Sequence, residues 1–195
     1  PAMKANFDGL GRATATYLTD RGGDAIPGAG SHIDVWSPST RLAVLTGDRV
    51  IEVTEQTFVA GTESSLGGMP FLTTRLQRIH SPATDIGAPA SADFIATFRT
   101  SHYDAAARQV AIAEWGTNQS TFAPSGSAPS SSDAAPDAVP TSGGALVTQF
   151  LYDPRGLAST RINPGPGVGS GSRVDRTLVD ALGRTIATVE NDEDS

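Results

Sequence analysis

Four aspartates are the residues whose types and spacing most clearly favour a particular chemistry in this chain. Each is followed a few residues later by Gly or Arg. They lie in the segments Phe7-Asp8-Gly9-Leu10-Gly11-Arg12, Tyr103-Asp104-Ala105-Ala106-Ala107-Arg108, Tyr152-Asp153-Pro154-Arg155-Gly156-Leu157 and Val179-Asp180-Ala181-Leu182-Gly183-Arg184. An Asp carboxylate can accept a hydrogen bond from the backbone N–H two residues on, which fixes the first position of a type I turn. The chemistry that this spacing favours is therefore hydrogen bonding within a turn.

Gly stands three residues after Asp8, Asp153 and Asp180, at Gly11, Gly156 and Gly183. In a hairpin whose turn ends in a bulge, Gly adopts the left-handed conformation at this position without a Cβ clash. Ala107 stands at the same place after Asp104, where a positive φ would cost about 1 kcal/mol. We therefore predict bulged hairpin turns at the three Gly-containing segments and leave another turn type open at Asp104.

The residues that flank each turn have an expected place in a hairpin. An aromatic or aliphatic residue ends the incoming strand, where it can pack across the hairpin: Phe7, Tyr103, Tyr152 and Val179. An arginine opens the outgoing strand in three of the segments: Arg12, Arg108 and Arg184. A guanidinium there could reach the Asp, or the carbonyl groups of a neighbouring unit. One hairpin alone is marginally stable in water, so the stacking of several is the expected source of stability.

A sequence segment of one type that occurs four times indicates a repeat protein. The commonest residues of a repeat protein usually serve the architecture rather than a reaction. The aspartates stand at positions 8, 104, 153 and 180. A unit of roughly 20 to 27 residues with loop insertions accommodates all of these intervals. The longest interval leaves room for degenerate copies, and the regions around Phe58 and Phe71 are the candidates.

Between the four segments, the sequence alternates strand-like runs with turn-forming residues. The β-branched and alternating runs predict strands over residues 12–18, 42–45, 50–59, 71–80 and 109–115. Thr46-Gly47-Asp48 predicts a hairpin turn. The Ala triplet 105–107 could suggest a helix over 104–114, but its match to the other three segments favours a hairpin. The predicted fold class is all-β, an array of antiparallel β-hairpins.

Composition divides the chain into four parts. Residues 1–118 form a repeat segment with degenerate central copies, and residues 145–190 hold two further repeats. The Ser/Ala/Pro-rich stretch 119–144 is predicted to be a flexible loop, because it cannot bury enough apolar surface to offset its ordering entropy. A second flexible piece is expected at 164–172, and the acidic residues 191–195 are expected to fray.

Charge and composition exclude several classes of protein. The 195 residues include 14 Lys and Arg against 21 Asp and Glu, and this net charge of -7 argues against nucleic acid and anionic membranes as partners. There are no cysteines, which excludes disulfides and thiolate chemistry. No apolar run approaches the roughly 20 residues of a transmembrane helix. The chain opens without Met and without a signal peptide, so we interpret it as an internal segment.

Other residues that could bind or react have weaker patterns. His32, His80 and His102 lack metal-ligand spacing and are predicted to be surface or strand residues. Residues 165–171 do not join a strand to a helix, and residues 192–194 lack the spacing of a calcium loop. We expect no metal or cofactor. Trp36 and Trp115 could stack on a sugar, although isolated tryptophans in β structure are more often packing residues.

The four segments resemble the YD repeat of the RHS-repeat family, which is a Tyr-Asp pair followed by two variable residues, Gly and Arg. Phe7 to Arg12 and Val179 to Arg184 match best, Leu157 replaces the Arg of the third copy, and Ala107 replaces the Gly of the second. The resemblance implies a β-hairpin ribbon that spirals into a hollow shell, in bacterial secreted or cell-surface proteins that enclose or deliver a C-terminal effector such as a toxin. This chain would then supply an arc of the shell, with neighbouring repeats as its partners.

Asp153-Pro154-Arg155-Gly156-Leu157 also resembles the Asp-Pro-x-Gly-Leu motif near the end of many RHS shells, where aspartyl self-cleavage releases the effector. Thr148 stands where that motif normally has Pro, and another ordinary repeat follows at 179–184. A plain turn is therefore the favoured interpretation. Our expectation is a non-catalytic structural segment; the alternatives are an adhesive or carbohydrate-binding surface module and a self-cleaving shell.

Overall fold

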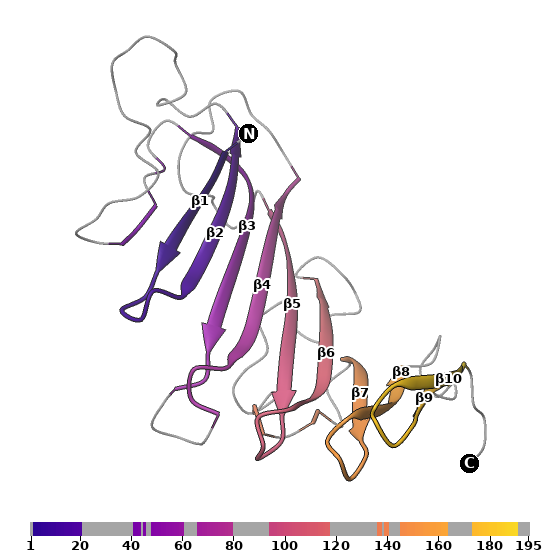
Figure 1. The fold of residues 1–195 in the computed structure, drawn as a ribbon. Helices are drawn as coiled ribbons and strands as arrows, with labels where there is room; N and C mark the ends of the chain where they lie inside the picture. The colour runs from indigo at the N-terminus through magenta and orange to yellow at the C-terminus, as the bar shows by residue number, and fades with distance from the viewer. Residues whose placement is uncertain are drawn as a thin grey trace. The chain divides into compact units, whose positions relative to one another are not determined.

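A computed structural model of the chain describes residues 2–20, 41–43, 45, 48–60, 66–79, 94–117, 136–137, 139–140, 145–163 and 173–190. Ten β-strands and their turns make up most of this part of the chain, and no residue in it is helical (Figure 1). The strands are β1 (Ala2–Phe7), β2 (Ala13–Asp20), β3 (Arg49–Phe58), β4 (Pro70–Arg78), β5 (Phe94–Tyr103), β6 (Gln109–Thr117), β7 (Leu146–Tyr152), β8 (Ala158–Asn163), β9 (Arg173–Val179) and β10 (Thr185–Val189).

The ten strands form one open sheet in which sheet order equals chain order, from β1 to β10. Consecutive strands are therefore antiparallel neighbours, as in a meander of hairpins. The predicted all-β array of antiparallel hairpins is confirmed. The strands predicted over 12–18, 50–59, 71–80 and 109–115 correspond to β2, β3, β4 and β6. The helix considered for 104–114 does not form, because β6 begins at Gln109.

The strand predicted over residues 42–45 is wrong for the residues that the structure describes there. Residues 41–43 and 45 belong to no strand. Arg41 has a positive φ of 59°, which interrupts an extended backbone. The segment is held against β1 by single bonds instead: the Phe7 N–H donates to the Arg41 carbonyl at 2.9 Å, and the Ala43 N–H to Asn6 Oδ1 at 2.7 Å. The Asp48 N–H donates to the Leu45 carbonyl at 3.1 Å, as in a β-turn, while residues 46 and 47 lie outside the described residues.

The chain forms two compact units. The first unit comprises Pro1–Phe58, Leu72–Phe98 and Gly116–Ala128. Its core is the cluster of Val50, Val53 and Phe94, against which Tyr17, Leu45 and Leu76 pack. Lys4 and Asp48 are also buried here, with Lys4 Nζ 2.7 Å from Asp48 Oδ2. The opposite charges offset the desolvation that burial imposes on each of them.

The second unit comprises Val59–Phe71, Arg99–Trp115 and Pro129–Ser195. One cluster packs Val59, Leu66 and Tyr103 with Met69 and Phe71. From β6 to β9, the pairing aligns residues of one face in a row across four strands. That row consists of Ala111, Gln149, Ile162 and Val174. Ala111 and Ala113 are buried, whereas Gln149, Ile162 and Val174 are half-buried, so the burial of this face decreases from β6 to β9.

Several sequence predictions concern residues outside this description. Trp36, His32 and His80 lie there, as do residues 164–172, residues 191–195 and all of 119–144 except 136–137 and 139–140. In the described residues, no helix has the length and apolar character needed to cross a membrane.

Candidate functional site

The four aspartates each close a hairpin turn through their side chains. We call residues 8–12, 104–108, 153–157 and 180–184 the Asp turns. In each of them, Oδ1 of the Asp accepts the backbone N–H two residues on and the N–H four residues on, at 2.8–2.9 Å. The first of these bonds was predicted from the sequence, and all four copies confirm it. The second bond was not predicted, and it fastens the start of the outgoing strand to the same oxygen.

Backbone bonds close each Asp turn in the same way. The Asp N–H donates to the carbonyl four residues on, and its own carbonyl accepts the N–H three residues on, at 2.9–3.1 Å. The pairing shifts by one residue beside the turn in the β1–β2, β7–β8 and β9–β10 hairpins. Gly11, Gly156 and Gly183 have φ of 79°, 84° and 79°. These are the predicted bulged turns with glycine in the left-handed region.

Ala107 adopts the same conformation without being glycine. Its φ is 60°, its N–H donates to the Asp104 carbonyl at 2.9 Å, and Asp104 accepts the same set of hydrogen bonds as the other three aspartates. No other turn type is used at this copy. The hydrogen bonds of the Asp turn outweigh the left-handed strain of a single Ala, which is about 1 kcal/mol.

The arginine of each Asp turn binds the other carboxylate oxygen. Nε of Arg12, Arg108 and Arg184 lies 2.7 Å from Oδ2 of the Asp four residues earlier. The pKa of Asp8 and of Asp180 is lowered chiefly by the backbone N–H of this arginine, and that of Asp104 chiefly by its guanidinium. Each carboxylate is thus held in its charged form with both oxygens engaged.

The third Asp turn lacks this arginine and uses another. Leu157 stands at the position of Arg12, and Arg155, two residues after Asp153, donates from Nε to Asp153 Oδ2 at 2.9 Å. The pKa of Asp153 is lowered, first by the Leu157 N–H and then by Arg155. The sequence shows Leu157 in place of the usual arginine, but the replacement by Arg155 was not predicted. The sequence signal that could have predicted this contact is an arginine at another position of a turn that lacks the usual arginine.

A fifth copy of this backbone geometry joins β3 to β4. The Val59 N–H donates to the Met69 carbonyl at 2.9 Å, and the Gly68 N–H donates to the Val59 carbonyl at 2.8 Å. Gly68 has a φ of 86°. Val59, Gly68 and Met69 therefore take the places of Asp, Gly and Arg, with a longer loop between Val59 and Gly68. These bonds lie beside Phe58, in one of the two regions where the sequence predicts a degenerate copy.

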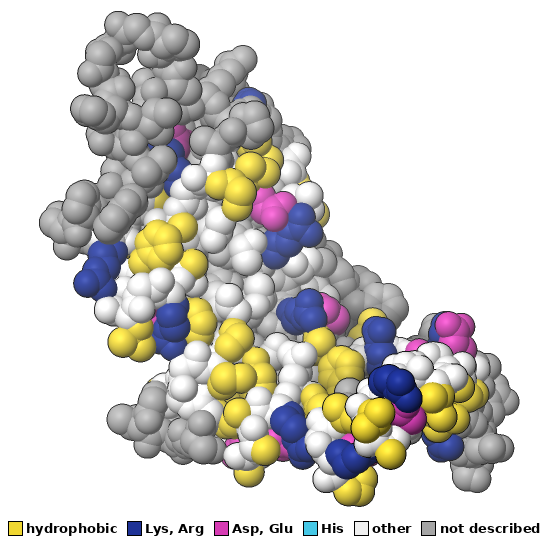
Figure 2. All heavy atoms as spheres, viewed as in Figure 1, with side chains coloured by type: hydrophobic (Ala, Val, Ile, Leu, Met, Phe, Trp, Pro, Cys, Tyr) yellow, Lys and Arg dark blue, Asp and Glu magenta, His cyan; other side chains and the backbone are white. Residues whose placement is uncertain are grey.

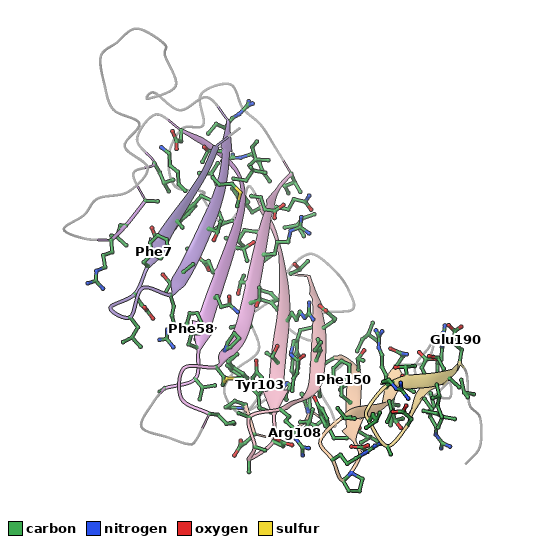
Figure 3. The ribbon with its side chains drawn as sticks, viewed as in Figure 1. Phe7, Phe58, Tyr103, Arg108, Phe150 and Glu190 are labelled. Carbon is green, nitrogen blue, oxygen red and sulfur yellow. The ribbon has the colours of Figure 1, made fainter. Side chains whose placement is uncertain are left out.

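Consecutive hairpins meet at a contact that repeats along the array. We call it the junction: the first residues of one outgoing strand contact the aromatic residue that ends the next incoming strand. In the first unit, the Arg12 guanidinium carbon lies 4.1 Å from the centre of the Phe58 ring. In the second unit, that of Arg108 lies 4.5 Å from the centre of the Tyr152 ring. Figure 3 shows Arg108 and Tyr103 at the turn end of β5 and β6. Each arginine thus binds its own Asp and stacks on the next hairpin.

Tyrosine hydroxyls make the second bond of the junction. Tyr152 donates to the Gln109 carbonyl at 2.6 Å, and Tyr103 donates to the Pro70 carbonyl at 2.6 Å. Gln109 follows Arg108, and Pro70 follows Met69, which takes the arginine position. The two bonds are therefore equivalent in the repeat. They account for Tyr, rather than Phe or Val, before the Asp at these two copies.

Arg155 extends the contacts to the last hairpin. Its Nη1 donates to the Asp180 carbonyl at 2.6 Å, and Arg41 Nη1 makes the same kind of bond to the Asp8 carbonyl at 2.9 Å. A Cβ added at Gly183 would lie 3.1 Å from Leu157 Cδ1, so the residue at the arginine position of one hairpin packs on the turn of the next. The predicted reach of arginine to its Asp is confirmed, and carbonyls of neighbouring turns are bound as well.

Trp115 is not available as a sugar-stacking platform, which corrects one sequence prediction. The residue is 5% exposed, and its indole Nε1 donates to Thr100 Oγ1 at 2.9 Å. The same hydroxyl lies 2.8 Å from Nε2 of His102, which is fully buried and meets Phe71 edge-on. His102 is a strand residue, as expected, in a buried hydrogen-bonded group. Within the described ranges, no three His, Asp or Glu side chains gather as metal ligands.

A scan against protein-family models finds no match to this chain, and a search of curated proteins finds no similar sequence.

Replacing Ala107 by Gly and Gly11 by Ala should change stability in opposite directions. Ala107→Gly removes left-handed strain of about 1–2 kcal/mol and loses part of that gain to the greater freedom of Gly in the unfolded chain. We expect a net gain of about 0.5–1 kcal/mol in the free energy of unfolding, measured by urea denaturation. Gly11→Ala reverses both terms and should lose about 0.5–1 kcal/mol, since nothing lies within 4 Å of the new Cβ and only φ is strained. Destabilisation by Ala107→Gly would contradict the prediction.

A double-mutant cycle should detect the junction between Arg108 and Tyr152. Arg108→Ala, Tyr152→Leu and the double variant should give a coupling energy of about 0.5–1 kcal/mol, from the stacked guanidinium. Urea denaturation of the four proteins measures it. Arg99→Ala is the matched control, because Arg99 pairs with Glu114, and it should be additive with Tyr152→Leu. A zero coupling for Arg108 would remove the junction as a source of stability.

The Asp turns should make stability depend on pH in the acid range. Because the pKa of Asp104 is lower in the folded chain than its ordinary 3.8, the unfolded chain takes up the proton first. This contribution is fully present above about pH 5 and is lost as pH falls through the ordinary value and below. In urea titrations from about pH 6 to about pH 2.5, Asp104→Asn should therefore show a shallower loss of stability than the wild type. An identical slope would show that this carboxylate contributes nothing.

Proposed function

We propose that this chain is a structural, non-catalytic segment of a YD-repeat protein of the RHS type, contributing to a β-shell or surface fibre. The observation that supports the proposal is what the carboxylates and arginines of the Asp turns bind. All four carboxylates bind backbone N–H groups and an arginine of their own turn. The arginines then bind or stack on the next hairpin where one follows in the described residues. The repeated polar residues are thus used to build hairpins and to join them.

The wider role rests on the resemblance to the YD repeat. In this role, the shell or fibre encloses or presents a C-terminal effector, in a protein that is secreted or displayed on a bacterial cell surface. Neighbouring repeats of the same kind are the partners. The junctions support this role, because each hairpin presents a surface made to fit another hairpin rather than a small molecule.

Self-cleavage at Asp153 is the enzymatic alternative, and the geometry of its turn favours the structural role. Oδ1 accepts the N–H groups of Arg155 and Leu157, Oδ2 accepts Arg155 Nε, and the pKa of the carboxyl is lowered. An aspartate that donates a proton during peptide cleavage needs a raised pKa near the working pH. Asp153 instead has the hydrogen bonds of the three other Asp turns, which lack the Asp-Pro sequence.

Intact-mass spectrometry tests the structural proposal against self-cleavage. The purified chain, incubated for a long period at mildly acidic and at neutral pH, should remain one species of full mass. The Asp153→Asn variant should give the same spectrum, since the carboxylate has no catalytic role. A fragment that ends at Leu157 in the wild type, and that is lost in Asp153→Asn, would overturn the proposal.

A further inference from the structure

Lys4 is the only lysine of the chain, and its amine is buried. Among the 14 Lys and Arg, all the others are arginines. Lys and Arg side chains are spread over the surface of the described residues (Figure 2), and those of Arg99, Arg173 and Arg184 are at least 49% exposed. The Lys4 side chain is 1% exposed. A guanidinium stays charged in proteins, whereas a buried lysine amine can lose its proton and become a nucleophile.

Strand pairing places Lys4 on the packed face of the first unit. Lys4 pairs with Tyr17 across β1 and β2, and Tyr17 pairs with Val53 across β2 and β3. Residues that are paired in this way lie on the same face of a sheet. Val53 belongs to the buried cluster of the first unit, and Tyr17 packs against it. The Lys4 side chain therefore lies on the face that carries the apolar core.

Asp48 reaches the same face from the segment before β3. It stands in the chain between Leu45, which packs against the buried cluster, and Val50, which belongs to it. The Asp48 N–H donates to the Leu45 carbonyl at 3.1 Å, which holds the residue in a turn. Its side chain is fully buried, and Oδ2 lies 2.7 Å from Nζ of Lys4. Because Cγ is bonded to Oδ2, the amine nitrogen is also close to the carbon of the carboxyl group.

The carboxyl group of Asp48 lacks the hydrogen bonds that hold the other buried or half-buried aspartates as carboxylates. Within the described residues, neither Oδ1 nor Oδ2 accepts a hydrogen bond, because the short contact with Nζ does not have the angles of one. In the Asp turns, by contrast, both oxygens are hydrogen-bonded. A buried charge without such bonds is costly, which favours a step that removes both charges of the pair.

We propose that Lys4 and Asp48 form an intramolecular isopeptide bond, which is an amide between Nζ and Cγ. A proton first passes from Nζ to the carboxylate, so that the amine and the acid are both neutral. The lone pair of Nζ then attacks Cγ and the N–C bond forms. The hydroxyl group of the acid leaves with a proton of the amine as water. The ammonium and the carboxylate thus become one amide and one water molecule, without an oxidant or a co-reactant.

Two features of the pair favour this condensation. Well-oriented groups held in contact react with an effective concentration of about 10⁵–10⁸ M. Bulk water is excluded from the site, because both side chains are at most 1% exposed. The bond would close a loop of residues 4–48 in a chain without cysteine, in which no disulfide can form. The inference goes beyond the proposed structural role, since the bond modifies the chain itself.

Mass analysis of the full chain tests the proposal. The purified protein should be lighter than its sequence by the mass of one water molecule. Trypsin cleaves after arginine but not after an acylated lysine, so the digest should contain a branched peptide in which residues 1–12 are joined to residues 42–49. Fragmentation of this peptide should locate the bond at Lys4 and Asp48. The only lysine should also fail to react with an amine reagent when the chain is unfolded in urea.

Three variants separate the cross-link from other losses of water. Lys4→Arg keeps the positive charge without the amine and should restore the full mass, and Asp48→Ala should do the same. Glu52→Ala is the matched control, because Glu52 is a carboxylate of the same unit that pairs with Arg75 at the surface. This control should keep the mass deficit. Circular dichroism reports whether each variant is folded.

A wild-type mass without the deficit, together with a reactive Lys4 amine in urea, would overturn the proposal. A deficit that persists in Lys4→Arg would place the dehydration elsewhere, such as in a succinimide at Asp8-Gly9, and would overturn it as well. The digest of the wild type gives the answer even if a variant does not fold. Cleavage after Leu157 divides the chain, whereas the cross-link removes one water from an undivided chain. Failure of this proposal is therefore distinguishable from failure of the proposed non-catalytic role.

Discussion

The hydrogen bonding of one aspartate carboxylate determines how each Asp turn is built and how its hairpin meets the next. Oδ1 binds two backbone N–H groups and thereby fixes the turn, while Oδ2 binds a guanidinium. Each of these bonds replaces a bond to water, so its contribution to stability is the net difference between the two. More important for the array, the bond to Oδ2 holds the arginine extended at the start of the outgoing strand. That position lies beside the aromatic residue of the next hairpin. The carboxylate that closes the turn therefore also positions the arginine for the junction.

The repeat conserves these bonds rather than the residues that make them. Arg155 provides the guanidinium that position 157 lacks, and Ala107 takes the backbone conformation of Gly. Val59, Gly68 and Met69 keep the backbone bonds without any carboxylate, and there the apolar cluster of Val59, Leu66 and Tyr103 supplies the stability instead. A hairpin can lose one element because neighbouring hairpins hold its strands on both sides, as expected when stability is a sum of nearest-neighbour terms.

The parts of the fold that could be predicted from the sequence depend on residues close together in the chain. The Asp-x-x-Gly spacing determines the turn locally, and the runs around residues 54 and 75 carry the β-branched pattern of a strand. The parts that could not be predicted depend on distant residues. Leu42 to Leu45 has the composition of a strand, but it meets β1 through Arg41 and a side-chain bond of Asn6. Trp115 is buried because strand pairing brings it to Thr100, which local sequence does not reveal.

Two residues of the repeat, the tyrosine before the Asp and the arginine after it, bind neighbouring hairpins as well as their own. The tyrosine before the Asp is not needed by its own turn, since Phe7 and Val179 occupy that place with the same turn geometry. Its hydroxyl serves the hairpin before it, through Pro70 or Gln109. The arginine likewise serves the hairpin after it. The hairpin with Tyr103 and Arg108 therefore carries one residue that binds the hairpin before it and one that stacks on the hairpin after it, and this gives the array a direction. At the first hairpin Arg41 binds the Asp8 carbonyl, and at the last described hairpin Arg184 binds Asp180 Oδ2.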